Sequence, residues 1–338
     1  MKLKKYLFPI IYSFLLIAFT VYVVLDTFVI VRVYDSVDTG ESSRPSYTLP
    51  SESTAPDEPV ESGTLSSGFD ETDETKSPEE TWIPEETEPI ITEPIITENS
   101  YKDNNISINI IEYFAYGSKI YVADVQISSP EYLKTAFAKD QYGRNITQKT
   151  STMAENNGAI LAVNGDYYGA RESGYVIRNG VLYRNTPASN RDALAIFDDG
   201  HMVIIEEKYT TAETLQASGA VQVLSFGPGL VVDGEIVVGE KDEVSVSSSK
   251  GNPRTAIGEI DELHYLIIVS DGRTKESSGL SLYELAEFMQ SLGVTTGYNL
   301  DGGGSSTMWF NGKILNYPTT DGKKFEERSV SDIVYIGY

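Results

Sequence analysis

A run of small residues after Asp301 has the composition of an anion-binding loop. Residues 301–306 read Asp-Gly-Gly-Gly-Ser-Ser. Consecutive glycines accept positive φ angles, so their N–H groups can converge on one point and hold a negative charge. The serine hydroxyls add donors, and Asp301 is fixed at the end of a strand. A tight connection that needs glycine only for steric reasons would read the same way, so both interpretations stay open. The candidate anion-binding residues are Gly302, Gly303, Gly304 and Ser305.

A second polar loop has the composition of a sugar-binding segment. Residues 164–169 read Asn-Gly-Asp-Tyr-Tyr-Gly and follow the apolar run 159–163. Asn164 offers an amide, Asp166 a carboxylate and Tyr167 a phenol, which together can hold sugar hydroxyls and stack on a ring. An ordinary Asn-Gly turn with aromatic residues in the core is the alternative.

Two arginines lie in further polar loops. Arg254, in Asn-Pro-Arg-Thr-Ala at 252–256, could offer a planar fork to a phosphate, although a lone arginine is more often an ordinary ion-pair residue. Arg273 follows Asp271 and Gly272, which pairs a guanidinium with a carboxylate.

Composition excludes several classes of site. The 338-residue chain has no cysteine, so disulfides, zinc-thiolate sites and thiol nucleophiles are absent. With His201 and His264 as its only histidines, a multi-histidine metal site is close to excluded. The formal charge is −24, without a basic cluster in the C-terminal part, which argues against nucleic-acid binding. The sequence predicts no cofactor and no metal site, and leaves a divalent cation open.

These loops are positioned by short strands. Alternating patterns at 106–110 and 120–127 predict half-buried strands, and the apolar runs 159–163 and 263–269 predict buried ones. Hairpins are expected at 176–183, 193–205 and 230–238, and a further strand at 297–300. The fold class is therefore α+β, with mixed or antiparallel sheets of short strands and a few helices.

Two helices are marked by their ends. Residues 150–157 predict a short helix with Ser151 or Thr152 as N-cap and Gly158 as its stop. Ser281 and Glu284 form a capping box, and apolar residues then recur at helical spacing up to Gly293.

The first 34 residues predict a membrane anchor. Lys2, Lys4 and Lys5 precede an apolar run at about 7–25, long enough to cross a bilayer. Lysines on the N-terminal side favour a cytoplasmic N-terminus. The run ends in bulky residues and offers no site for signal cleavage. We expect a single-pass signal anchor at 1–34 that places the rest of the chain outside the cytoplasm of a cell, which we expect to be bacterial.

Residues 35–100 predict an acidic, disordered stalk. They hold 18 acidic and two basic side chains, with many Ser, Thr and Pro residues. Such a segment buries too little apolar surface to offset the entropy of the chain. The folded domain is therefore expected at 101–338.

Six stretches of the domain, taken in order, resemble the phosphodiester glycosidase family. The stretches are residues 162–168, 226–234, 252–258, 269–273, 279–286 and 299–306. The first departs from the commonest form of the family motif, because Asp166 stands where a second glycine is usual. This departure implies an altered loop backbone or an extra carboxylate.

The resemblance implies a membrane-anchored, extracytoplasmic hydrolase that cleaves a sugar-1-phosphodiester, of the N-acetylglucosamine-1-phosphate type, in a cell-surface glycan or polymer. Such a site needs anion stabilisation for the phosphate, for which Arg254 and the glycine loop are candidates, and a carboxylate at the anomeric carbon. Asp301 and Asp166 are candidates for the carboxylate, with Asp271 in reserve. The alternative is a non-catalytic module that binds sugar phosphate or polysaccharide in exopolysaccharide or cell-wall assembly. The expected partners are a carbohydrate or sugar-phosphate polymer and the membrane.

Overall fold

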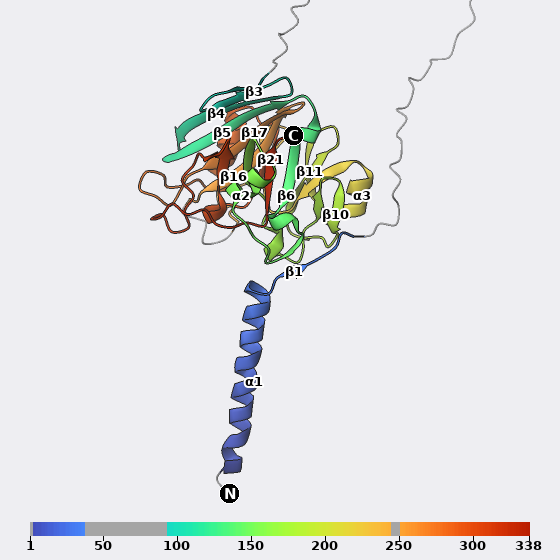
Figure 1. Ribbon diagram of the computed structural model, residues 1–338, viewed down its shortest axis with the longest axis vertical. Helices are drawn as coiled ribbons and strands as arrows, with labels where there is room; N and C mark the ends of the chain where they lie inside the picture. Colours follow the sequence, from blue (N-terminus) through green and yellow to red (C-terminus); the bar gives the residue numbers. More distant parts are fainter. Residues whose placement is uncertain (1–2, 38–92, 245–250) are drawn as a thin grey trace, which may run out of the picture. The chain divides into compact units, whose positions relative to one another are not determined.

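The computed structural model describes residues 3–37, 93–244 and 251–338 (Figure 1). Most of the predicted stalk, residues 38–92, lies outside the described residues, so the stalk stays a prediction.

The N-terminal apolar run forms one long helix. Helix α1 spans Leu3–Phe28, and its part Ile10–Phe28 has a mean hydropathy of 2.0. It is long and apolar enough to cross a membrane, as an anchor or as a signal sequence.

The largest sheet has nine strands, and its neighbouring strands pair antiparallel. In spatial order they are β15 (Glu235–Ile236), β14 (Gly229–Val232), β18 (Thr296–Asn299), β16 (Arg254–Asp261), β17 (His264–Ser270), β5 (Ser118–Ile127), β4 (Ile106–Ala115), β3 (Ser100–Lys102) and β2 (Ile95–Ile96). Strands β4 and β5 lie side by side (Figure 1), and Ile106 pairs with Ile127. The side chains of β4 alternate between buried and more exposed positions, as its sequence pattern predicts.

Two five-stranded sheets complete the domain. The first contains β10 (Val181–Arg184), β9 (Val176–Arg178), β13 (Ala220–Leu224), β11 (Asp192–Phe197) and β12 (Met202–Glu206). The second contains β20 (Lys313–Ile314), β19 (Met308–Phe310), β8 (Leu161–Asn164), β21 (Asp332–Ile336) and β6 (Leu133–Phe137). The three predicted hairpins are confirmed as β9–β10, β11–β12 and β14–β15.

The main core lies between the three sheets. Tyr298 from the nine-stranded sheet shares one apolar cluster with Leu194 of β11 and Val163 of β8. A second cluster contains Ala256 of β16 together with Met289 of α4, so α4 covers the other face of the large sheet. This arrangement places the ends of β8, β16 and β18 close together.

Helices are few and short in the domain. They are α2 (Thr150–Asn156), α3 (Ala212–Ala217) and α4 (Leu282–Ser291), with 3₁₀ turns η1 (Pro130–Tyr132), η2 (Ala138–Asp140), η3 (Tyr168–Ala170) and η5 (Gly303–Ser305). The capping box of α4 is confirmed, because the Ser281 hydroxyl accepts from the Glu284 N–H and Glu284 bonds back to the Ser281 N–H. The predicted N-cap of α2 is wrong. That helix begins at Thr150 after Lys149, since Glu327 takes the Ser151 N–H and hydroxyl instead.

Mostly sheet with a few helices, the domain has the predicted α+β class. Folded structure also lies outside the predicted boundary at residue 101. Strand β2 extends the large sheet at Ile95–Ile96, and β1 (Arg32–Val33) pairs with β7 (Gly143–Arg144).

Candidate functional site

The loop after β18 is tied to two loops that lie far away in the sequence. The Asn164 side chain donates to the Asp301 carbonyl at 2.5 Å, and the Asp301 N–H donates to the Gly165 carbonyl at 3.2 Å. The Gly303 N–H donates to the Pro253 carbonyl at 2.8 Å. The predicted loops at 164–169, 252–256 and 301–306 therefore meet at one place.

The other motifs join the same place. The Asn299 side chain donates to the Gly227 carbonyl at 2.8 Å, and the Arg273 guanidinium donates to the Asn252 side chain at 2.7 and 3.1 Å. A β-bridge pairs Asn252 with Leu280, just before α4. Six stretches spread over 145 residues of sequence thus form one constellation around residues 301–306.

Asn164 organises this constellation from inside the protein. Its side chain is fully buried, and its carbonyl oxygen accepts from the Thr255 hydroxyl at 2.9 Å and from the Thr307 N–H at 3.2 Å. With its amide donating to Asp301, the side chain holds three segments in register.

The glycines of residues 302–304 allow close packing of the loop and also leave backbone N–H donors free. Gly303 alone of the three glycines has a positive φ, of 63°. A Cβ would lie 2.8 Å from the Pro253 carbonyl at Gly302, and 2.4 Å from the Thr320 hydroxyl at Gly304, so neither position tolerates a side chain. Within the described residues, the N–H groups of Gly302 and Gly304 donate no hydrogen bond, which leaves two donors in the loop.

Asp301 is a buried carboxylate with one accessible edge. Its side chain is 11% exposed, and one oxygen lies 3.2 Å from Nη2 of Arg328. Burial raises the pKa of the Asp301 carboxyl above its ordinary value, and the Ser305 hydroxyl and the Arg328 charge offset only part of this rise. A raised pKa makes a carboxylate a stronger base.

Arg328 is a site residue that the sequence analysis missed. Its Nε and Nη2 donate to the Ser305 hydroxyl at 2.9 and 2.5 Å, and Nη2 also reaches Asp301. The side chain is 43% exposed, so it remains accessible to a ligand. It lies in an irregular segment without a recognisable motif, so no sequence signal marked it.

Arg273 lies on the other side of the glycine loop. A Cβ on Gly303 would come within 2.9 Å of its Nη2, and its Nη1 donates to the Thr320 carbonyl at 2.9 Å. Burial lowers the pKa of Arg273, and the nearby charges of Arg328 and Arg254 lower it further. An added negative charge would therefore be favoured at this place.

Arg171 supplies a further cation that the sequence analysis missed. It donates to the Ser225 carbonyl at 3.1 Å and lies 4.6 Å from the centre of the Phe226 ring. Burial and the charge of Arg191 lower the pKa of Arg171, and the charges of Asp166 and Asp301 offset only part of this fall. Arg328 and Arg171, from two separate segments, therefore both bring positive charge to Asp301.

Asp166 lies in a different environment. Its side chain is 0% exposed. Nη2 of Arg178 lies 2.9 Å from the Asp166 carboxylate and 2.7 Å from the Asp332 carboxylate. The Ser225 and Tyr168 N–H groups donate to it at 2.8 and 3.0 Å. Burial opposes its charge, but Arg178 and the Ser225 N–H prevail and lower the pKa of Asp166. A carboxylate enclosed in this way can hold the loop but cannot touch a ligand without rearrangement.

The remaining predicted residues have partners within the protein. Arg254 is 3% exposed, its Nη2 lies 2.5 Å from Glu243, and its Nε donates to the Leu280 carbonyl at 2.8 Å. Asp271 accepts from the Tyr317 N–H at 2.7 Å, and burial raises the pKa of Asp271.

Tyr167 points a large surface to solvent. It is 42% exposed and has a φ of 65°, in the left-handed region. In the described part of the chain, no group of three or more His, Asp or Glu side chains could hold a metal ion.

Comparison with known proteins places the folded domain in a family. The model of the phosphodiester glycosidase family matches residues 157–337, more than half of the chain. The SPbeta prophage-derived uncharacterized protein YomE of Bacillus subtilis is 32% identical over 204 residues, covering 58% of this chain and 31% of the relative. The N-acetylglucosamine-1-phosphodiester alpha-N-acetylglucosaminidase of Mus musculus is 29% identical over 177 residues, covering 48% and 34%. The chain thus spans about a third of the length of these relatives.

Solved structures share the fold. The zebrafish N-acetylglucosamine-1-phosphodiester alpha-N-acetylglucosaminidase catalytic domain, auto-inhibited by its pro-peptide, has a TM-score of 0.55 and 22% identity, covering 69% of this chain and 83% of that one. A hypothetical protein from Synechocystis has a TM-score of 0.51 and 17% identity, covering 69% and 62%. On the family match and the shared fold, the chain belongs to the phosphodiester glycosidase family.

Proposed function

We propose that the domain hydrolyses a sugar-1-phosphodiester, of the N-acetylglucosamine-1-phosphate type, in a glycan or polymer at the cell surface. The observation that carries the proposal is Asp301, a carboxylate with an exposed edge that contacts the Arg328 guanidinium and begins the glycine loop that Arg273 borders. The activity for which the mouse relative is named supports the same chemistry.

The bond to be broken explains this combination of charges. A phosphate monoester departs as a stable anion, so less acid catalysis is needed than in ordinary glycoside cleavage. The site must instead stabilise the negative charge of the phosphate and supply a carboxylate at the anomeric carbon.

The structure offers candidate groups for each requirement. Arg328 is accessible, Arg273 borders the glycine loop at Gly303, and the Gly302 and Gly304 N–H groups of this loop are free to donate in the described structure, so we assign the phosphate to these groups. Asp301 acts at the anomeric carbon, where its raised pKa makes it an effective base or nucleophile. Arg254 is buried and paired with Glu243, so we assign it a supporting role behind the loop rather than contact with the phosphate.

Helix α1 is proposed to anchor the chain in a membrane. Lys2, Lys4 and Lys5 precede its apolar part, which favours a cytoplasmic N-terminus and an extracytoplasmic domain. Protease added to intact cells should then remove the domain, and full protection of the domain would contradict this topology.

The activity is tested with the full chain in neutral detergent. We expect it to release sugar from a synthetic N-acetylglucosamine-1-phosphodiester, and Asp301→Asn to slow that release roughly 10²–10³-fold while leaving the melting temperature unchanged. Binding of the same compound without turnover would instead identify a non-catalytic module, and neither binding nor turnover would show that the sugar or the linkage is another one.

A further inference from the structure

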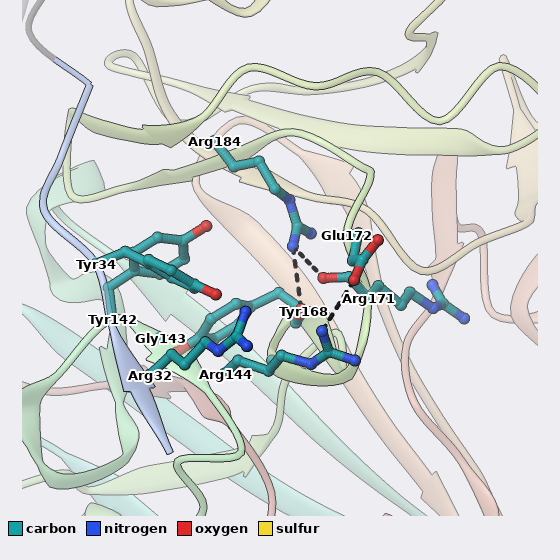
Figure 2. A pocket seen from close by; sticks show the side chains of 10 residues that line it. Arg32, Tyr34, Tyr142, Gly143, Arg144, Tyr168, Arg171, Glu172 and Arg184 are labelled. Carbon is teal, nitrogen blue, oxygen red and sulfur yellow. Dashed lines mark hydrogen bonds and ion pairs between the residues drawn. The ribbon is translucent and has the colours of Figure 1, made fainter. Parts of the chain in front are cut away.

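A pocket of about 210 Å³ lies at the Tyr168–Arg171 turn (Figure 2), and of its lining residues only Arg171 also belongs to the candidate site described above. Its lining holds four arginines and three tyrosines but a single acidic residue, Glu172, in a chain of formal charge −24. The cationic and aromatic lining residues are Arg32, Arg144, Arg171, Arg184, Tyr34, Tyr142 and Tyr168. Such a volume fits a small group such as a phosphate ester rather than a large metabolite.

The pocket exists because the chain after α1 packs against the domain. In the β1–β7 pair, Arg32 is the direct cross-strand partner of Arg144, and the Tyr34 N–H donates to the Tyr142 carbonyl at 3.0 Å. A Cβ on Gly143 would lie 2.0 Å from the Arg32 carbonyl, so only glycine allows this approach. Two like charges directly opposite each other destabilise a strand pair, and an anion between them would remove that penalty.

Two buried polar groups of the pocket have donor capacity that no partner uses in the described structure. Tyr168 is 1% exposed, and its hydroxyl, whose oxygen lies against the Gly143 N–H, donates no hydrogen bond. Nη2 of Arg184 is also buried and unpartnered, although Nη1 of the same side chain donates to the Tyr168 and Arg171 carbonyls at 3.1 and 2.7 Å. Unsatisfied buried donors are uncommon, and two of the six unpartnered buried side-chain atoms in the described residues belong to the lining of this pocket.

The remaining arginine charges are only loosely held. Arg144 pairs at 2.9 Å with Glu172, whose side chain is 81% exposed, and Arg32 pairs with Asp26 near the end of α1. Exposed ion pairs are weak, so an anion can compete for these guanidinium groups. Figure 2 shows Arg32, Arg144 and Arg184 around the pocket, with the Arg171 side chain turned away from it.

The place of the pocket in the chain suggests the source of the anion. Arg32 follows the last residue of α1, Phe28, by four residues, so it lies within roughly 14 Å of the helix end along the chain. Val29 and Val31, between Phe28 and Arg32, and Val33, just after Arg32, have exposed apolar side chains. If α1 spans a bilayer, these residues lie at the membrane surface, at the level of lipid phosphates.

We propose that this pocket binds the phosphate of an anionic lipid headgroup and thereby fixes the folded domain at the membrane surface. The proposal rests on the membrane anchoring by α1 but not on the hydrolytic activity. The Arg32 and Arg144 guanidinium groups hold the phosphate from two sides. Nη2 of Arg184 and the Tyr168 hydroxyl complete the set of donors.

The test uses the full chain in nanodiscs of phosphatidylcholine, with or without phosphatidylglycerol. Hydrogen exchange of residues 30–37 and 142–145 is followed. We expect phosphatidylglycerol to slow this exchange roughly tenfold, and the double variant Arg32→Gln/Arg144→Gln to lose the effect. The matched double variant Lys208→Gln/Lys313→Gln removes the same charge from exposed sites outside the pocket. It should still show the slower exchange in phosphatidylglycerol. An equal loss in both double variants would show general attraction to an anionic surface and overturn the proposal.

A second variant tests whether the double arginine variant acts only by detaching β1 from β7. Tyr168→Phe removes only a hydroxyl that donates no hydrogen bond, so the variant should fold normally. It should weaken the phosphatidylglycerol effect several-fold. An unchanged effect in Tyr168→Phe would overturn the role of this donor set.

The source of the phosphate is tested in detergent micelles with inorganic phosphate and glycerol 1-phosphate. Protection by these soluble ions without protection by phosphatidylglycerol would overturn the lipid assignment. Sugar release measured on the same samples keeps the two proposals apart, because loss of the lipid effect with retained hydrolysis concerns the pocket alone.

Discussion

The loops that begin at Asn164 and Asp301 look alike in sequence but differ in what surrounds their carboxylates. Each follows a buried strand and combines an aspartate with glycine. Asp166 is fully enclosed and shares Arg178 with Asp332, whereas Asp301 keeps an exposed edge beside the accessible Arg328. The comparison shows that the origin of the partnering arginine goes with the exposure of the carboxylate: the aspartate paired with a core arginine is enclosed, and the one paired with an accessible arginine is not.

The two arginines come from different kinds of segment. Arg178 ends β9 inside the protein, and its guanidinium also donates to the Val223 carbonyl, so it is locked in place. Arg328 lies on an irregular segment with 43% of its side chain exposed. Substitution of Arg178 should therefore affect folding, and substitution of Arg328 should affect the candidate chemistry.

The largest expected effect is on stability, from Arg178→Met. This change leaves two carboxylates buried without a cation, and breaking a buried ion pair in this way costs about 3–5 kcal/mol. Urea unfolding of the full chain in neutral detergent measures it. Arg328→Met is the matched control and should change the free energy of unfolding by about 1 kcal/mol or less. A similar loss in both variants would remove the distinction between the two regions.

The next effect is on turnover, from Asp301→Asn. This change keeps the size of the side chain and removes its charge, so we expect kcat/KM to fall roughly 10²–10³-fold, or about 2.7–4 kcal/mol. The loss should be similar for a sugar phosphodiester and for an aryl glycoside of the same sugar, because both need the carboxylate. Near-full activity would move the catalytic role to Asp166 or Asp271.

A smaller and more selective loss is expected from Arg273→Met. The lost contact serves the phosphate, so turnover of the phosphodiester should fall about tenfold to a hundredfold, by roughly 1.4–2.8 kcal/mol. Turnover of the aryl glycoside, which carries no phosphate, should change little. Arg254→Met is the informative comparison, because it leaves Glu243 buried and should lower stability instead. If Arg254→Met proves selective for the phosphodiester, the sequence-based assignment of Arg254 is the better one.

The sequence was sufficient for the elements that follow local rules. Strand alternation predicted β4 and β5, Asn-Gly predicted the β9–β10 turn, and the capping box predicted the start of α4. Each of these depends on residues a few positions apart. The N-cap of α2 was missed because its decisive partner, Glu327, lies far along the chain.

The candidate site shows the same limit. Sequence order predicted that the loop residues matter, and the structure brings Asn164, Gly303 and Arg273 together. The sequence could not predict the role of Arg328, which has no motif, or the pairing of Arg254 with Glu243. Whether a carboxylate is enclosed or accessible is set by contacts with other segments, such as Arg328 with Asp301 at 27 residues and Asp332 with Asp166 at 166 residues along the chain. Local sequence patterns do not encode such contacts.

The smallest expected effect is a pH dependence of stability from the enclosed region. Burial and the charge of Asp166 raise the pKa of Asp332 to about 7 in the folded protein, above its ordinary value of 3.8. The folded state therefore keeps a proton that the unfolded chain releases at lower pH, and its contribution to stability is lost as the pH rises through 7. Asp166, whose pKa is lowered, acts in the opposite sense but only at acid pH.

Between pH 5 and pH 7 we thus expect the free energy of unfolding to fall by about 1–2 kcal/mol through Asp332. Asp332→Asn cannot titrate, so its urea midpoint should fall less over this interval than that of the unchanged protein. Asp321→Asn is the control, because this exposed carboxylate lies outside the Arg178 cluster and its removal should preserve the slope. If Asp332→Asn keeps the full slope, the proton lies elsewhere, and Asp166 and Asp332 are both charged on Arg178 at neutral pH.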